Sequence, residues 1–160
     1  KLYKNSLTVG VSRTEFFLAK AFVLTCIALL QVIISLVIAF IPATILNGFG
    51  TMPDGFIGNL LITISLQFLC LLAWLSIVSF ILYVSHSYLA VFIGYLVSSI
   101  LLSMPMLIFP SIKILPYLSL QFSYAMTANS ESIFYTLIVT LAVILIFNLS
   151  GLAVFKKKSL

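Results

Sequence analysis

Few side chains in this chain can ionise, and their positions decide which chemistry is possible. Its 160 residues include eight Lys or Arg, three Asp or Glu and one His. None of these falls in the four long apolar segments at about 21–46, 56–83, 88–109 and 132–155. A proton-coupled carrier needs an ionisable group within the bilayer, and these segments offer none. The sequence also has no paired carboxylates, no nucleophile beside a base and no phosphate-binding glycine loop. We therefore predict that the chain is not an enzyme, and that a partner supplies the energy for any uphill movement.

Histidine and cysteine, the usual ligands of transition metals, are placed unfavourably for a metal site. His86 falls in the short turn between the second and third apolar segments, where an ordinary loop histidine is the simpler interpretation. Cys26 and Cys70 fall in different segments at different depths, without metal-ligand spacing and without an obvious disulfide partner. We predict no metal and no cofactor bound by this chain.

Neutral polar side chains are the chemistry that the apolar segments keep. They recur at helical spacing, so that several would share one helix face. Gln31 and Gln67 would reach the middle of the bilayer, where an unpaired amide is costly. We expect each to bond with the other, with another helix or with a wet cavity. Two interpretations are open for the whole set, helix packing and a substrate-facing lining. The set comprises Gln31, Ser35, Asn59, Thr63, Gln67, Ser98, Thr140 and Asn148.

The composition predicts which elements hold these side chains. Hydrophobic residues make up 63% of the chain and charged residues only 7%, whereas a soluble domain carries about 25% charged residues. Each apolar segment is long enough to cross a membrane: the 26 residues of segment 21–46 would span roughly 39 Å as a helix, against a hydrocarbon core of about 30 Å. The predicted fold is an all-α polytopic membrane protein with four transmembrane helices in a transmembrane domain, residues 21–155.

Residues 110–131 break this pattern. Pro110 and Pro116 interrupt them, and Lys113 and Glu131 should reach water. Apolar residues alternate from 118 to 126, which is typical of a strand, but a lone strand cannot satisfy its backbone at a bilayer. We expect this external segment to hold a short interfacial or re-entrant helical element before the last transmembrane helix.

The distribution of basic residues predicts the orientation. Residues 1–20 and 156–158 hold seven of the eight Lys and Arg, and Lys113 is the exception. An even number of crossings places both ends on one side, and cytoplasmic loops collect basic residues. We predict a multi-pass protein of the cell membrane with cytoplasmic N and C termini and a basic tail at 156–160. Because the basic residues lie beside apolar runs, we expect the lipid bilayer, and not nucleic acid, as a partner.

Residues 1–20 give the chain a polar, cationic start. Gly10 is typical of a helix end, and Ser12-Arg13-Thr14-Glu15 is a capping box that begins a new helix. Val11 and Phe16 are spaced for a hydrophobic staple. The pattern predicts a helix, a sharp elbow and a second helix that enters the apolar segment. Such an elbow could dock a protein or bind anionic lipid headgroups.

The same stretch carries a family resemblance. Lys4-Asn5, Gly10, Ser12-Arg13, Phe16-Phe17 and Lys20, followed by a long apolar helix, resemble the permeases of type 2 ABC transporters. The most similar branch is bacterial and exports, or protects against, peptide antibiotics. In that family the stretch forms an amphipathic cytoplasmic coupling helix and elbow, which dock on the ATP-binding subunit. The family also has a partly re-entrant element before its last crossing, and it ends as this chain does, through Gly151 and Phe155 to a lysine cluster.

The resemblance implies partners and a function. Family members usually have six membrane helices, so this chain would supply the last four and be truncated at its N-terminus. It would be the permease subunit of an ATP-driven exporter in the bacterial cytoplasmic membrane, moving an amphipathic peptide antibiotic, lipid or drug. It would pair with a second permease copy and with an ATP-binding subunit that holds ATP and Mg. The residues implied in docking are Lys4, Asn5, Leu7, Gly10, Ser12, Arg13, Glu15, Phe16 and Lys20. The main alternative is a non-transporting membrane immunity or scaffold protein, and an intramembrane enzyme lacks its residues.

Overall fold

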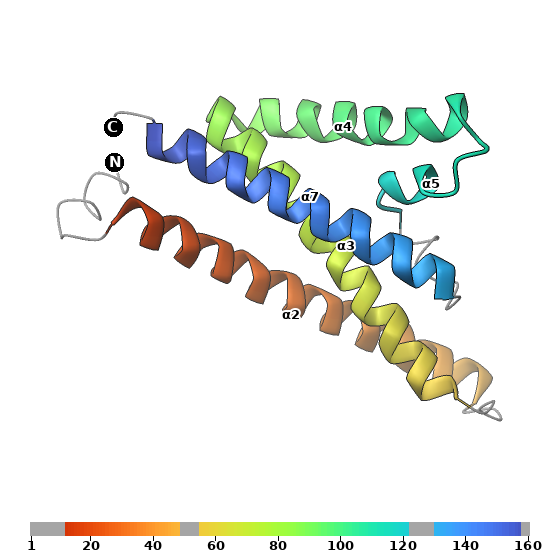
Figure 1. Ribbon diagram of the computed structural model, residues 1–160. Helices are drawn as coiled ribbons and strands as arrows, with labels where there is room; N and C mark the ends of the chain where they lie inside the picture. The colour runs from red at the N-terminus through yellow and green to blue at the C-terminus, as the bar shows by residue number, and fades with distance from the viewer. Residues whose placement is uncertain (1–11, 49–54, 122–129, 158–160) are drawn as a thin grey trace.

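The fold is a bundle of four long helices, seen in a computed structural model that describes residues 12–48, 55–121 and 130–157. In chain order the elements are α2 (Arg13–Asn47), α3 (Phe56–Ser85), α4 (Tyr88–Ile108), the single turn α5 (Leu115–Leu118) and α7 (Ser130–Lys157) (Figure 1). Four of these helices are long and apolar enough to cross a membrane. The prediction of an all-α polytopic membrane protein is confirmed.

The helix bounds follow the predicted ranges, and the first helix also includes the predicted capped start ahead of its apolar segment. The other three long helices begin and end within two residues of the ranges predicted from the sequence. Helix α2 begins at Arg13, where the capping box predicts a helix start, contains the apolar segment that begins at residue 21, and runs through Pro42 to Asn47. It begins there because the Ser12 capping box already starts the helix in the polar elbow.

Helices α3 and α7 run parallel to each other at the centre of the bundle and share its most extensive contact. Helix α2 lies on one side of this pair and α4 on the other (Figure 1). The start of α2, the turn between α3 and α4, and the end of α7 lie at the same end of the bundle. The chain therefore crosses the bundle four times, and both ends of its described part lie together.

The core lies between α3 and α7 and includes a residue from outside the long helices. Its buried members are Ala73 and Ile77 of α3, Val139 and Val143 of α7, and Leu120. Leu120 follows α5 and is 2% exposed. The connection between α4 and α7 therefore turns back into the bundle, and does not stay at its surface.

Local backbone bonds make this return possible. The amides of Leu115, Tyr117 and Leu120 donate to carbonyls three residues earlier, at 3.1–3.2 Å, so the segment satisfies much of its own backbone, as an apolar setting requires. Leu120 takes a positive φ of 52°, which ends any alternation of side chains there. The described part of the alternating run, residues 118–121, therefore forms a turn and not a strand. The rest of the run lies in residues 122–129, outside the described residues.

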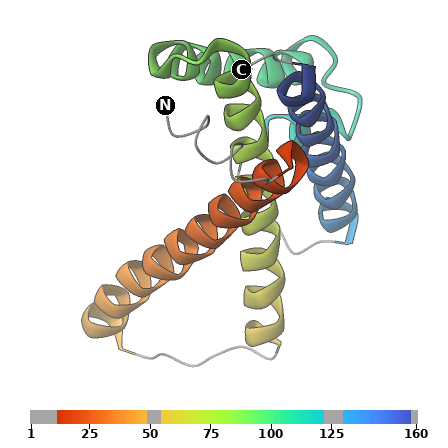
Figure 2. The same cartoon turned by 90° about the vertical axis from the view of Figure 1, so that its left-hand side faces the viewer.

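Helices α2 and α4 are peripheral. Of the described side chains of α2 only Phe17 and Ala28 are buried, and of α4 none is. Beyond Ala28 the second half of α2 diverges from α3, as Figure 2 shows. Two apolar helices that bury so little of themselves within the chain leave most of their surface to lipid or to another protein.

Candidate functional site

The start of α2, which is the described part of the predicted elbow, is held by the predicted capping box. The Ser12 amide donates to Glu15 Oε2 at 2.8 Å, and the Glu15 amide donates to Ser12 Oγ at 3.2 Å. Two of the amides that a helix start leaves unpaired are satisfied in this way. The prediction of a capping box is confirmed. The docking residues Lys4, Asn5, Leu7 and Gly10, the staple residue Val11 and the Arg13 side chain lie outside what the structure describes.

Four rings tie this elbow to the ends of α3 and α7. This aromatic cluster consists of Phe16 and Phe17 of α2, Tyr83 of α3 and Phe155 of α7. The Phe17 ring centroid lies 5.4 Å from that of Tyr83 and 6.2 Å from that of Phe155, and Phe16 stacks on Phe155 at 6.1 Å. Tyr83 and Phe155 also meet edge to face at 5.9 Å. Aromatic pairs of this kind are worth about 0.5–1.5 kcal/mol each beyond the area they bury, so the cluster couples the elbow to two further helices.

Lys20 lies on the same end of the bundle, one turn further along α2. Its Nζ is 5.9 Å from the centroid of the Phe16 ring and 5.7 Å from that of Tyr83, which is cation–π distance. The side chain is half-buried and lines a groove between α2 and α3. Among the predicted docking residues, the structure therefore places Phe16 and Lys20 together and Ser12 with Glu15.

The two mid-membrane glutamines meet at one crevice where α2 and α3 begin to diverge. This amide crevice has a volume of about 350 Å³. Gln31 and Ser35 line it from α2, and Gln67 lines it from α3; its other walls are apolar. No hydrogen bond joins either glutamine amide to another described residue, so, of the three alternatives predicted for these amides, the direct bond between them is absent among the described residues. Both amides instead line the amide crevice.

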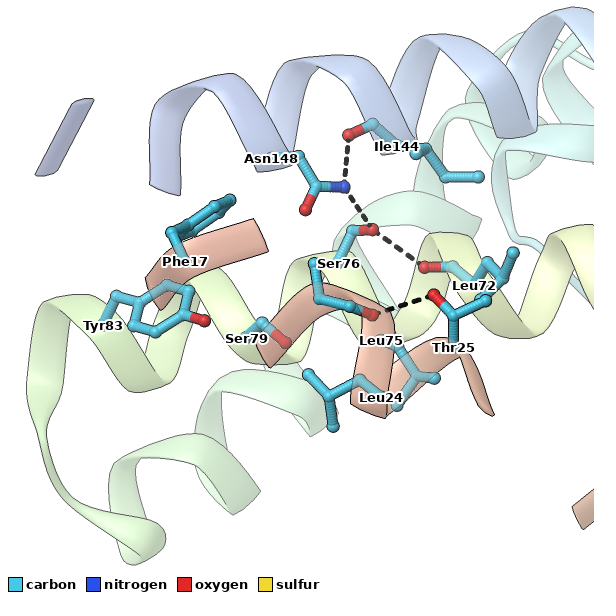
Figure 3. A pocket seen from close by; sticks show the side chains of 11 residues that line it. Phe17, Leu24, Thr25, Leu72, Leu75, Ser76, Ser79, Tyr83, Ile144 and Asn148 are labelled. Carbon is cyan, nitrogen blue, oxygen red and sulfur yellow. Dashed lines mark hydrogen bonds between the residues drawn. The ribbon is translucent and has the colours of Figure 1, made fainter. Parts of the chain in front are cut away.

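A polar contact between α3 and α7 pairs another predicted residue. The Asn148 amide donates from Nδ2 to Ser76 Oγ at 2.9 Å and to the carbonyl of Ile144 at 2.8 Å. Ser76 in turn donates to the carbonyl of Leu72 at 2.9 Å. Figure 3 shows this chain of bonds beside a small cavity of about 90 Å³, which α2, α3 and α7 line together. Asn148 therefore joins two helices.

The remaining predicted residues are dispersed. Thr140 is 1% exposed, and its hydroxyl donates to the backbone carbonyl of Thr136, one turn earlier in α7. The hydroxyl of Thr136 is buried and has no partner among the described residues. Asn59, Thr63 and Ser98 are not among the residues that line the amide crevice. The predicted lining set thus divides into a crevice group, two residues that bond within the bundle (Thr140 and Asn148) and three residues whose side chains do neither within the described part of the chain.

Two contributors were missed from the sequence. Tyr83 completes the aromatic cluster, and Ser76 accepts the bond from Asn148. Ser76, Ser79 and Tyr83 follow one another at spacings of three and four residues, which places them on one face of α3. The same periodicity that selected the glutamines could therefore have selected this face.

The polar groups of the crevice and of the small cavity are amides, hydroxyls and one phenol. Such groups donate and accept hydrogen bonds but carry no charge at neutral pH. The arrangement is suited to binding an uncharged polar group in apolar surroundings. No protein-family model, curated protein or solved structure matches this chain.

Proposed function

We propose that this chain is the membrane-spanning permease subunit of an ATP-driven exporter of the type 2 ABC class. A separate ATP-binding subunit would dock on the cationic elbow, and a second permease copy would complete the pathway. The substrate would be amphipathic, for example a peptide antibiotic, a lipid or a drug. The proposal places the end of the bundle that carries the elbow in the cytoplasm of a bacterial cell.

The aromatic cluster is the observation that carries this proposal. A docking element can act on a transport path only if its movement reaches the helices that form the path. Phe16 and Phe17 follow directly on the capped elbow, and their rings contact α3 and α7 through Tyr83 and Phe155. A push on the elbow would therefore reach three of the four long helices without passing through a flexible connection.

The amide crevice supports the choice of substrate. Its walls are apolar except for Gln31, Ser35 and Gln67, so it suits a molecule that is mainly apolar and has a few hydrogen-bonding groups. The charge-free apolar segments support an external energy source, because they hold no group that could bind a driving proton. Both features are compatible with a transport subunit that has no catalytic residues of its own.

The test is complex formation with the ATP-binding subunit encoded nearest to this gene. Replacing Arg13 by Glu reverses a charge at the elbow, and we expect the yield of ATPase that co-purifies with the tagged chain to fall at least about tenfold, a loss of roughly 1.4 kcal/mol. Lys113→Glu is the matched control, since Lys113 lies at the opposite end of the bundle, and it should leave the yield unchanged.

Two outcomes would contradict the proposal. An Arg13→Glu yield equal to that of the unaltered chain would remove the elbow from docking. Failure of the unaltered chain to co-purify with any ATP-binding subunit would favour the immunity or scaffold alternative, for which direct binding of a peptide without nucleotide would be the expected activity.

A further inference from the structure

A groove between α2 and α3 combines one cation with apolar walls at the end of the bundle where the described termini lie. Its volume is about 360 Å³. Val23 and Leu24 line it from α2, Leu82 and Tyr83 line it from α3, and Lys20 is the one charged residue in the lining. The groove is distinct from the amide crevice, which lies further along α2 and shares no lining residue with it.

The position of Lys20 along α2 sets the depth of the groove. Lys20 is the last charged residue before the uncharged stretch that begins at Ala21, so its ammonium belongs at the level of the lipid headgroups. Val23 and Leu24 lie about 4.5–6 Å deeper along the helix axis, at the level where acyl chains begin. The groove therefore presents a cation and an apolar wall in the order in which a phospholipid presents its phosphate and its chains.

The rings of Phe16 and Tyr83 fix the cation at the mouth of the groove. Both centroids lie within 6 Å of Nζ, so the ammonium is held beside α3 rather than extended along α2. A lysine ammonium binds phosphate as a point charge with several donors. Basic pockets between transmembrane helices on the cytoplasmic side are typical binding sites for anionic headgroups.

The lining of the groove suits the hydrocarbon of a lipid. Apart from Lys20, Ser79 and the Tyr83 phenol, its walls are apolar side chains. A single acyl chain is thinner than a helix and can lie along Val23, Leu24 and Leu82.

We propose that this groove binds one anionic glycerophospholipid, with its phosphate at Lys20 and an acyl chain against Val23, Leu24 and Leu82. The proposal does not depend on the exporter function. It reassigns Lys20 from the docking surface to a lipid site, and it leaves protein docking to the residues before it in the chain.

The experiment is native mass spectrometry of the purified full chain with phosphatidylglycerol or phosphatidylcholine carrying identical acyl chains. We expect the chain to retain phosphatidylglycerol preferentially. Lys20→Gln should weaken that binding about fivefold, the effect of one basic residue at an anionic lipid surface, while Lys20→Arg should preserve the preference. Val23→Trp, at a site that is 54% exposed, should fill the groove and reduce binding although Lys20 is intact.

Lys113→Gln is the matched control, because it removes one cation from the opposite end of the bundle, and it should keep the preference unchanged. Equal retention of the two lipids by the unaltered chain, or an undiminished preference in Lys20→Gln, would overturn the proposal. Displacement of the lipid by glycerol 3-phosphate at similar concentration would also overturn it, because the site would then recognise a free phosphate and not a lipid.

Discussion

At the scale of single residues, the described amides in the apolar helices have different surroundings. Asn148 donates two hydrogen bonds, one of them to Ser76 on another helix. Gln31 and Gln67 face the amide crevice without a bond to another described residue. An amide that makes its bonds inside the chain contributes to stability, whereas one that faces a cavity is available for something that enters.

This difference leads to a paired prediction. Asn148→Leu should lower the free energy of unfolding in detergent by about 0.6–1.7 kcal/mol, from the average to the largest value typical of hydrogen bonds between membrane helices. Gln67→Leu should leave that free energy unchanged or raise it, and should impair export of the substrate. Thermal unfolding of both variants, with a transport assay on Gln67→Leu, checks this. A loss of stability in Gln67→Leu as large as that in Asn148→Leu would assign Gln67 to helix packing.

At the scale of the elements, α4 comes close to α3 at Gly94. A Cβ placed on Gly94 would lie 2.9 Å from Cδ1 and 3.0 Å from Cγ2 of Ile81, nearer than side-chain carbons normally come. Close by, Trp74 and Tyr95 rings meet at 5.0 Å. Helix α4 buries none of its residues within the chain, and this close approach lies in its interface with α3.

Enlarging Gly94 tests the importance of the contact. Gly94→Leu should lower the stability of the bundle by about 1–3 kcal/mol, as overpacking typically does, and adding Ile81→Ala should restore part of the loss. Gly58→Leu is the matched control, because a Cβ on Gly58 meets nothing within 4 Å. Equal unfolding temperatures for Gly94→Leu and Gly58→Leu would show that α3 and α4 are not held together at this position.

The elements also show what could be predicted from the sequence and what could not. The start of α2 was predictable because Ser12 and Glu15 are three residues apart and bond only with each other. The long helices were predictable because uncharged apolar length is a property of the chain alone. The burial of Leu120 was not predictable, since it depends on Ala73 and Val139, which are distant in sequence. Sequence reasoning placed Gln31 and Gln67 on helix faces, but only the crossing of α2 and α3 brings them to one crevice.

At the scale of the whole molecule, the two ends of the bundle differ in charge. The end with the elbow carries Lys20 and Lys156, and the other end carries the exposed ion pair of Lys113 with Glu131 at 3.3 Å. An exposed pair of this kind contributes little stability. Charged groups favour water over hydrocarbon, and the proposed function places this end of the bundle outside the cell.

Single cysteines can test that orientation in a background with Cys26→Ala and Cys70→Ala. Ser111→Cys lies in the exposed connection after α4, and Ser87→Cys lies in the exposed turn between α3 and α4. A membrane-impermeant maleimide should label Ser111→Cys in intact cells, and should label Ser87→Cys only after permeabilisation. The reverse pattern would invert the topology and would place the elbow outside the cell, where no ATPase could reach it.

Because α2 diverges from α3 beyond Ala28, a solute would reach Gln31 and Gln67 from the hydrocarbon of the membrane and not from water. The residues of α2 beside the crevice, among them Ile34 and Ile38, are 55% and 66% exposed, and they belong at hydrocarbon depth. A solute that comes to this chain alone would dissolve in the acyl chains first and then diffuse in the plane of the membrane. Its oil–water partition coefficient would therefore select it before either amide made contact, and ions or sugars would be rejected without any dedicated filter.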